Sequence, residues 1–380
     1  MDYDVIVVGA RAAGAPTAML LAQQGMRVLV LDRDRYGTDT LSTHALMRGG
    51  VLLLSRWGLL DQIVGAGTPA IRRTTFHYGD ETVSVAIKPS PGVDALYAPR
   101  RTLLDRVLVD AAVAAGAEIR FGVTVTGLRR DRSGRVAGVI GRDRAGATLE
   151  ARAGLVVGAD GVRSKVAREA GACTLHSGTG ASAVMYGHWS GLDIEGYEWF
   201  YRPGHSAGLI PTDAGEVCVF AGVPARDRRA AYRRLLAAAT GDDRRLLAAQ
   251  PPRRVRTWIG CPGFIRQAQG PGWALVGDAA FFQDPLSTHG ITDALRDAEL
   301  LSRAVAAGDT DSLADHRERI IRPLFDVVDR IASYDWDLAE LQGLLRKLSA
   351  AMSQEVDLLQ GPVASVPAGS RPPPNRCQRL

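Results

Sequence analysis

A glycine-rich turn stands near the start of the 380-residue chain, between an apolar β-branched run and a helical segment. The turn is Gly9-Ala10-Arg11-Ala12-Ala13-Gly14. In the dinucleotide fingerprint GxGxxG, the first glycine makes the tight turn, the second admits the pyrophosphate and the third lets helix and strand pack closely. Arg11 replaces the second glycine, so either the backbone lies farther from the phosphates or the guanidinium adds its charge there. A glycine turn without a ligand is the alternative.

Carboxylates follow three further apolar runs that read as buried strands. Asp32 ends the run 27–31, and an acidic residue there hydrogen-bonds the ribose of an unphosphorylated adenosine. Asp160-Gly161 and Gly277-Asp278 follow the runs 155–157 and 274–276, and a carboxylate at a strand end can bind the hydroxyls of a ribityl chain. Gly290 and Ile291 open a helix, whose N-terminus stabilises negative charge such as that of a reduced flavin anion.

This ordered set of motifs resembles the FAD-dependent monooxygenases of the para-hydroxybenzoate hydroxylase type, a superfamily that also contains geranylgeranyl reductases and flavin-dependent halogenases. The match spans Tyr3 to about Ala304. The resemblance implies one FAD, bound non-covalently, and it adds Arg101 at a helix start and Pro285 in the loop under the flavin ring. The full set of FAD contacts that we expect is Gly9, Arg11, Ala13, Gly14, Asp32, Arg33, Arg101, Val125, Asp160, Gly161, Gly277, Asp278, Pro285, Gly290 and Ile291.

The resemblance predicts an NAD(P)H- and O2-dependent monooxygenase that hydroxylates or epoxidises a small aromatic or secondary-metabolite substrate through a flavin hydroperoxide. A reductase or dehydrogenase of the geranylgeranyl reductase type is the first alternative, and a flavin-binding cyclase or structural partner without redox turnover is the second. The halogenase motif Trp-x-Trp-x-Ile-Pro is missing, since only Trp199-Phe200-Tyr201 comes near it. A second dinucleotide fingerprint is also missing, which agrees with the transient binding of NAD(P)H in this family.

Two histidines are candidates for acid–base catalysis near neutral pH, because they lie in segments that approach the flavin in the family. His44 lies in the long loop 34–46, and His289 precedes Gly290. The alternative is that each only positions other groups. Aromatic and histidine side chains of the expected substrate sheet could line a pocket, although packing is the commoner role in a sheet; they are His188, Trp189, Trp199, Tyr201 and His205.

Composition excludes several other classes. The net charge of +5 is spread thinly, and no aromatic residues are interleaved with the arginines as a nucleic-acid platform requires. The four cysteines show no metal-ligand spacing, so we expect no metal site and four thiols in a reducing cytoplasm. Neither a signal peptide nor a membrane span is indicated. The sequence does not indicate the oligomeric state.

The expected fold is α/β. A discontinuous Rossmann-type FAD-binding domain, resembling that of glutathione reductase, comprises residues 1–72, 97–172 and 262–350 and ends in long helices. A mixed or antiparallel sheet for the substrate comprises 73–96 and 173–261. The flavin ring is expected at their interface, where ligand clefts commonly form. Residues 361–380, which carry Pro-Pro-Pro and several arginines, are expected to be a disordered tail.

Overall fold

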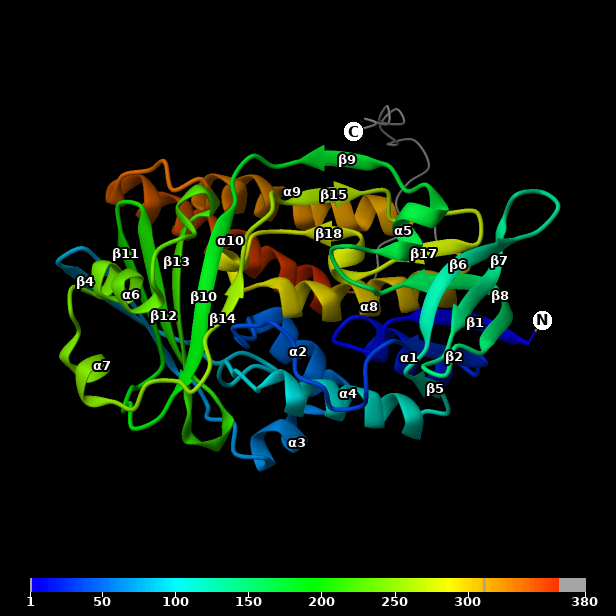
Figure 1. Ribbon diagram of the computed structural model, residues 1–380, viewed down its shortest axis with the longest axis horizontal. Helices are drawn as coiled ribbons and strands as arrows, with labels where there is room; N and C mark the ends of the chain where they lie inside the picture. The colour runs from blue at the N-terminus through cyan, green and yellow to red at the C-terminus, as the bar shows by residue number, and fades with distance from the viewer. Residues whose placement is uncertain (1, 310–311, 362–380) are drawn as a thin grey trace.

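Two large sheets lie at opposite ends of the molecule, and three helices run lengthwise along one side of both (Figure 1). The computed structural model describes residues 2–309 and 312–361. It is a mixed α/β structure, as the sequence predicts, with several sheets and C-terminal helices. None of the helices in these described ranges combines the length and the apolar character needed to cross a bilayer.

The first sheet is built on parallel strands, in the order β17-β8-β1-β2-β5. Its β-branched runs are buried on both faces, which is typical of parallel sheets covered by helices. The carboxyl ends of parallel strands share one edge, so the segments that follow β1, β2, β8 and β17 are brought together there. The strands are β1 (Tyr3–Val8), β2 (Val28–Asp32), β5 (Glu118–Phe121), β8 (Thr148–Gly158), β16 (Gln269–Gly270) and β17 (Trp273–Leu275).

An antiparallel ribbon and three helices complete this end of the molecule. Strands β6 (Thr124–Arg130) and β7 (Val136–Arg142) pair with each other and extend from β8. Helices α1 (Gly14–Gln23) and α4 (Arg101–Ala114) contact each other, and α5 (Lys165–Ala170) packs against β6 and β8. The apolar residues of α1 face the sheet, and they include the buried Ala15, Ala18 and Met19.

The second large sheet has the order β14-β10-β13-β12-β11-β3-β4 and is antiparallel except for the pair β11–β3. Its outer face is covered by α6 (Tyr232–Thr240), while α7 (Arg244–Ala248) follows along the chain (Figure 1). The strands are β3 (Arg73–Tyr78), β4 (Glu81–Ala86), β10 (Ser182–Trp189), β11 (Tyr197–Arg202), β12 (His205–Pro211), β13 (Val217–Pro224) and β14 (Arg256–Trp258). The division of the chain into two domains at the boundaries given above stays a prediction.

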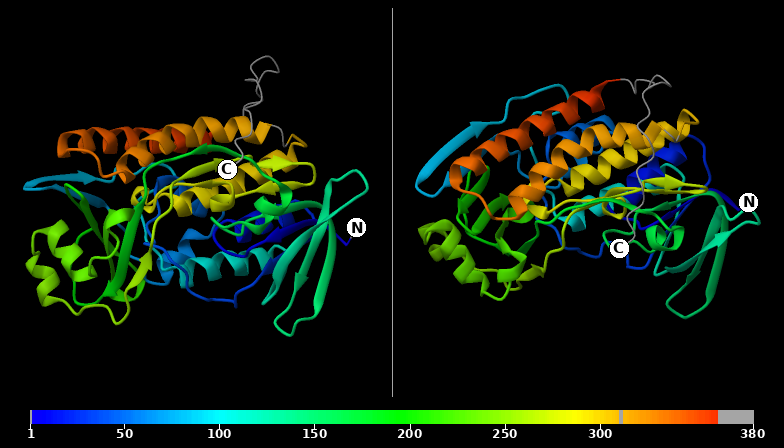
Figure 2. Two further views of the ribbon diagram at one scale, coloured as in Figure 1. Left: turned by 45° about the horizontal axis from the view of Figure 1, so that its top comes forward. Right: turned by 90° about the horizontal axis from the view of Figure 1, so that it is seen from above.

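A small third sheet, two short helices and three long helices connect the first large sheet with the second. A third sheet contains β9 (Thr174–Ser177), β15 (Phe264–Arg266) and β18 (Phe281–Phe282). Helices α2 (Arg48–Arg56) and α3 (Leu60–Gly65) contact each other, and α3 packs against α4. Helices α8 (Gly290–Ala306), α9 (Ser312–Ala332) and α10 (Leu338–Gln360) follow, and α9 and α10 lie side by side along the molecule (Figure 2).

Helix α10 extends ten residues beyond position 350, where the last segment of the FAD-binding domain was expected to end. The predicted disordered tail falls on residues 362–380, which lie outside the described residues. The expectation of four thiols is wrong: among the described cysteines Cys218 and Cys261 are free, whereas Cys173 is disulfide-bonded.

Candidate functional site

The turn between β1 and α1 is shaped by two glycines. Gly9 has a φ of +105°, and a Cβ there would lie 2.4 Å from the carbonyl oxygen of Ala159. A Cβ on Gly14 would lie 1.8 Å from the carbonyl oxygen of Gly9. Neither position therefore tolerates a side chain, and the turn opens α1 with no acidic residue in its first turn. The positive end of the helix dipole is left for an anion such as a pyrophosphate.

A cavity opens beside this turn, at the carboxyl end of β2. Asp32 is 6% exposed and accepts hydrogen bonds from the backbone N–H groups of Ala10 and Asp34, both at 2.7 Å. The cavity is lined by Ala10, Arg11, Asp32, Arg35, Thr38 and Phe121, among others. Arg33, which the sequence nominated, is exposed and is not part of this lining, whereas Arg35 is. An adenosine fits the place, because Asp32 lies at the strand end where a ribose is bound.

Arg11 is held by carboxylates. Its guanidinium donates to Asp34 at 3.0 Å, to Asp105 at 3.2 Å and to the carbonyl oxygen of Thr38 at 3.2 Å. Asp105 is shared with Arg101, whose guanidinium lies 2.9 Å from it. The side chain of Arg11 is one quarter exposed, and the nearby acids raise its pKa despite the cost of burial. Arg11 thus neutralises acidic groups at the rim of the cavity.

Asp278 follows β17 at the same sheet edge. Burial, together with the charges of Asp293 and Asp297, raises the pKa of its carboxyl to about 7, while Arg101 opposes the shift. Its neighbour Gly277 has a φ of +58° and donates its N–H to Asp297 at 2.9 Å. A half-buried carboxylate near Arg101 at the carboxyl edge suits the ribityl hydroxyls that the sequence predicts for it.

Three other residues predicted to contact FAD lie in and around helix α5 and the first sheet, and two of them have clear structural roles. The carboxylate of Asp160 caps the N-terminus of helix α5, because it accepts hydrogen bonds from the N–H groups of Lys165 and Val166 at 2.6 and 3.1 Å. Gly161 follows with a φ of +78°. Val125 is 8% exposed and packs in an apolar cluster of the first sheet with Val8 and other residues. Contacts of these three residues with FAD stay predictions.

The loop before α8 is anchored to the second sheet. Asp284 accepts from the N–H and hydroxyl of Ser182, at 2.7 and 2.6 Å, and from the N–H of Leu286 at 3.0 Å. Pro285 begins a single helical turn that this carboxylate caps. Gly290 opens α8 with no atom within 4 Å of where a Cβ would stand, and it is exposed, whereas Ile291 is buried. The first turn of α8 therefore has open space beside it at Gly290.

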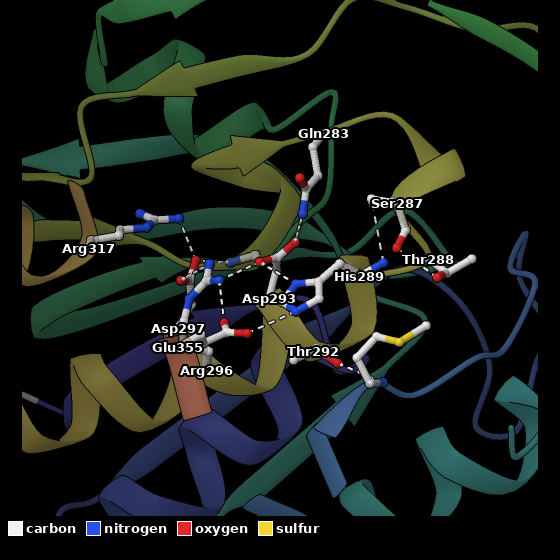
Figure 3. A network of polar contacts seen from close by, with 12 residues as sticks. Gln283, Ser287, Thr288, His289, Thr292, Asp293, Arg296, Asp297, Arg317 and Glu355 are labelled. Atoms are coloured by element: carbon white, nitrogen blue, oxygen red, sulfur yellow. Dashed lines mark hydrogen bonds and ion pairs between the residues drawn. The ribbon is translucent and has the colours of Figure 1, made fainter. Parts of the chain in front are cut away.

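Beneath this loop lies a buried ionic cluster that sequence reasoning missed (Figure 3). Asp293 and Glu355 contact the two ring nitrogens of His289, at 3.1 and 2.8 Å. The guanidinium of Arg296 pairs with both of these carboxylates and with Asp297. Asp297 also pairs with Arg317, and Asp293 accepts from Gln283 at 2.6 Å. Three acids therefore face three cations, and Glu355 comes from α10, far along the chain.

His289 is fully buried within this cluster. Burial alone would lower the pKa of its imidazole, but Glu355 and Asp293 outweigh it and raise the pKa to about 10. The imidazolium with both nitrogens engaged favours a structural role over proton transfer to a substrate. No periodicity or motif pointed to Glu355 as its partner, because the contact joins residues 66 positions apart.

His44 has a strained backbone conformation and is buried between the two ends of the molecule, which carry the first and the second large sheet. Its φ is +73°, which is costly for a residue with a Cβ, and it is 1% exposed. Its Nε2 lies 3.0 Å from Nε2 of His188 on β10, and its Nδ1 is buried without a hydrogen-bond partner among the described residues. Burial, the neighbouring His188 and three arginines lower the pKa of His44 well below its usual value. The imidazole is therefore neutral at physiological pH.

The chain is similar to several characterised proteins. It is 30% identical to a menaquinone reductase of Mycolicibacterium smegmatis over 323 residues, covering 80% of this chain and 76% of the relative. It is also 30% identical to a digeranylgeranylglycerophospholipid reductase of Methanococcoides burtonii, with 80% and 74% covered, and 26% identical to a squalene epoxidase of Schizosaccharomyces pombe, with 85% and 73% covered.

The fold is also found among solved structures. A geranylgeranyl bacteriochlorophyll reductase-like protein of Thermoplasma acidophilum superposes with a TM-score of 0.73 at 19% identity, covering 93% of this chain and 95% of that one. The model of the FAD binding domain matches residues 2–312. The glycine turn, the adjoining cavity and Asp278 fit the cofactor that this family binds. The chain belongs to the FAD-binding domain family, within its hydroxylase-like and geranylgeranyl reductase-like flavoproteins, and is an FAD-dependent oxidoreductase for which NAD(P)H is the typical donor.

Proposed function

We propose that this chain reduces a double bond in an apolar, isoprenoid-type substrate. The observation that carries the proposal is the chemistry of the inner face of the second sheet, where aromatic rings gather. The names of the menaquinone and digeranylgeranylglycerophospholipid reductases support it, because both describe reductases of molecules with isoprenoid chains.

The inner face carries a row of aromatic side chains across neighbouring strands. Tyr186 on β10 pairs with Phe220 on β13, and Phe220 pairs with Gly208 on β12, which in turn pairs with Trp199 on β11. The rings of Phe220 and Trp199 pack over Gly208, where a Cβ would lie 2.3 Å from Phe220. Their centroids are 6.0 Å apart. These three aromatic side chains are buried, so they give this face of the sheet an apolar wall, and such a wall suits an apolar or planar substrate.

The positive charges near this face are already neutralised. Arg100 pairs with Glu216 at 2.7 Å and Arg256 with Asp39 at 2.6 Å. Arg101 pairs with Asp105, as described above. A carboxylated aromatic substrate would need a cation that is not committed to another acid, so the pairing of these three arginines favours a neutral molecule.

The FAD, when bound, supplies hydride chemistry, and the chain supplies the surroundings. We assign the turn of Gly9 and Gly14 to the pyrophosphate, Asp32 to the ribose and Asp278 to the ribityl chain. The start of α8 at Gly290 and Ile291 faces the flavin ring in this assignment. His44 is assigned to the substrate side, where a reduction requires a proton.

The test compares products with and without oxygen. The purified holoenzyme is incubated with NADPH and a menaquinone carrying two prenyl units, and the products are analysed by mass spectrometry. We expect a product that has gained two hydrogens, formed equally well without oxygen. A product that has gained one oxygen atom, formed only in air, would contradict the proposal.

That second outcome would support the other candidate, a monooxygenase of the kind that the sequence resemblance predicts. The relative that favours it is the squalene epoxidase, whose name describes oxygen insertion into an isoprenoid. Both candidates use the same apolar face, so substrate-dependent oxygen consumption with NADPH separates them.

A further inference from the structure

We propose that His44 and His188 form a two-imidazole relay that carries protons from solvent to the substrate. The inference rests on the proposed function, since it assumes that a substrate is reduced beside His44. It starts from the 3.0 Å contact between the two Nε2 atoms, which is a hydrogen bond only if one of them carries a proton and the other does not. The hydrogen bond therefore couples the tautomers of the two rings.

The two ends of this pair face different surroundings. His44 is 1% exposed, and its Nδ1 is a buried polar atom with no hydrogen-bond partner in the described part of the chain. Buried polar atoms are rarely left unpaired, so an unpaired one near a cofactor site points to a ligand. His188 is only half-buried, so its outer nitrogen can exchange protons with water. The pair thus links an accessible nitrogen to an enclosed one.

The backbone conformation that holds His44 beside His188 is energetically unfavourable. A φ of +73° is uncommon for a residue with a side chain, and such strain concentrates at functional sites. The loop is fixed around it, because the N–H of Ser42 donates to the hydroxyl of Tyr186 at 3.0 Å and the N–H of His44 donates to the hydroxyl of Ser42 at 3.0 Å. Tyr186 also contacts His44 edge to face, with ring centroids 6.3 Å apart.

Burial, followed by the charged groups around the pair, lowers the pKa of both rings and keeps them neutral. Arg100 and Arg256, each paired with an acid, lower the pKa of His44 and of His188, and Arg101 lowers that of His44. Glu216 and Asp39 act in the opposite direction on His188 but do not prevail over burial. The thiol of Cys218 on β13 stays protonated because burial raises its pKa. Glu216 and Asp39 are the charges that favour the imidazolium form of His188.

The proton transfer balances without a net change of charge on the pair. In the starting state Nδ1 of His44 and Nε2 of His188 carry hydrogen. His44 gives its Nδ1 proton to the substrate, accepts the Nε2 proton of His188, and His188 takes a proton from solvent at Nδ1. After product leaves, water that enters the site protonates Nδ1 of His44, the Nε2 proton returns to His188, and His188 gives its Nδ1 proton back to solvent.

The two histidines and Cys218 also lie close enough together to bind one metal ion. The experiment must therefore distinguish a proton relay from a metal site. One ligand atom each from His44, His188 and Cys218 lie within 4.8 Å of one another. A metal bound to both Nε2 atoms would strip the proton from the hydrogen bond between them. Stoichiometric zinc or copper in the purified holoenzyme would therefore overturn the relay, and protein without metal supports it.

The direct test is 15N NMR of the holoenzyme with labelled histidine, assigned by the variants His44→Gln and His188→Gln. At pH 7 we expect two neutral rings in different tautomers, Nδ1–H for one and Nε2–H for the other. Identical tautomers, or an imidazolium at either position, would overturn the proposal. This measurement needs no substrate, so it judges the relay even if the proposed function fails.

The kinetic test uses dithionite-reduced holoenzyme mixed without oxygen with the two-prenyl menaquinone. His188→Gln keeps a hydrogen-bonding side chain but cannot pass a proton, so we expect reoxidation to slow by about 100-fold, the scale of a lost acid catalyst. Added imidazole should restore part of the rate, because His188 is reachable from solvent. The matched control His176→Gln alters a half-buried histidine on β9, outside the second sheet, and should leave the rate unchanged.

An unchanged rate in His188→Gln overturns the relay. A slow rate that imidazole does not restore, together with a weakened affinity for FAD, also overturns it, because the histidine would then be structural. If the wild-type enzyme itself is not reoxidised by the menaquinone, the proposed function fails, and the NMR result alone decides on the relay.

Discussion

At the residue scale, Asp278 is a carboxyl whose charge depends on what binds beside it. Its pKa of about 7 results first from burial and then from the neighbouring acids Asp293 and Asp297. In the apoprotein the group is partly protonated at neutral pH. A ribityl chain that donates hydrogen bonds to the carboxylate would lower this pKa again, because hydrogen bonds to the charged form favour it.

We predict that Asp278→Ala weakens FAD binding by about 1.5–3 kcal/mol, roughly 10- to 150-fold in Kd, because a charge-assisted hydrogen bond is lost. A fluorescence titration of the apoprotein measures it, and full flavin occupancy of the variant at low FAD concentration would contradict the assignment. The raised pKa gives a second readout. Stability from this group is present below about pH 4 and is lost as the pH rises through 7, so Asp278→Asn should melt at a higher temperature than wild-type apoprotein at pH 8.

Arg11 shows how a position that the fingerprint reserves for glycine can hold a long side chain. The guanidinium turns to Asp34 and Asp105 at the rim of the cavity, a conformation that the sequence did not reveal. Two alternatives were open from the sequence, a backbone that lies farther from the phosphates or a charge contact of the guanidinium with the pyrophosphate. The structure adds a third role, which is the neutralisation of acids that would repel the phosphates.

We predict that Arg11→Gly binds FAD more weakly, because Asp34 and Asp105 then lose their cation next to an anionic ligand. About tenfold in Kd at low salt is expected for a partly exposed ion pair, and the loss should shrink at high salt. Arg11→Lys should retain much of the affinity. Tighter binding by the glycine variant would show that the side chain is only tolerated.

At the element scale, helix α10 completes the support of the loop before α8, which we assign to the flavin ring. Glu355 is 1% exposed and contacts both His289 and Arg296, which stand at the start of α8. The two helices are thereby locked together by charge as well as by apolar packing. A buried charge that loses its partner is strongly destabilising, whatever the net worth of the intact pair.

We predict that Glu355→Gln lowers the free energy of unfolding by about 3–5 kcal/mol, because two buried cations lose a counter-charge. The matched control is Asp357→Asn on the exposed side of the same helix, which should change stability by less than about 0.5 kcal/mol. Chemical denaturation of both variants measures the difference. Equal stability of the two would show that the cluster tolerates the loss.

The same cluster predicts a dependence of stability on pH. The folded pKa of His289, about 10, lies above its unfolded value near 6.5, so its stabilisation is fully present below pH 6.5 and is lost as the pH rises towards 10. We expect the wild-type protein to lose stability between pH 7 and 10, and His289→Gln to show a flatter profile. Denaturant titrations at both pH values test this, and parallel profiles would contradict it.

The elements near the glycine motifs were predictable, and their long-range partners were not. The turn at Gly9, the strand ending at Asp32 and the helix beginning at Arg101 follow from apolar periodicity and glycine placement, which are local signals. The segment 226–249 divides into a short helical turn, α6 and α7, because Gly241 ends α6 in a left-handed conformation.

The candidate site shows the same limit. Its glycine and aspartate residues were predicted from motifs. The partners of His44 and His289, in contrast, come from a strand and a helix that are far away in the sequence. A single sequence contains no signal for such pairs. Only the geometry distinguishes His289, enclosed by carboxylates, from His44, whose Nδ1 is left unpaired.

At the scale of the whole molecule, the mode of flavin attachment depends on the protonation state of Cys261. Burial raises the pKa of its thiol, and the charges of Asp284 and Asp278 add to this shift. Its thiolate, the form that attacks a flavin, is therefore scarce at neutral pH. We predict that FAD is non-covalent: acid precipitation should release a yellow supernatant and leave a colourless pellet. A yellow pellet that Cys261→Ser turns colourless would identify a covalent bond.

The position of Glu355 has a consequence for biosynthesis. The family match ends at residue 312, yet the carboxylate that completes the cluster beneath the loop before α8 stands 43 residues later. On the ribosome the segments that we assign to the pyrophosphate and the ribityl chain emerge before this carboxylate, and the loop lacks its counter-charge until Glu355 has been made. Stable loading of the cofactor is therefore expected to follow the synthesis of α10, so that this helix decides when the enzyme becomes a holoenzyme.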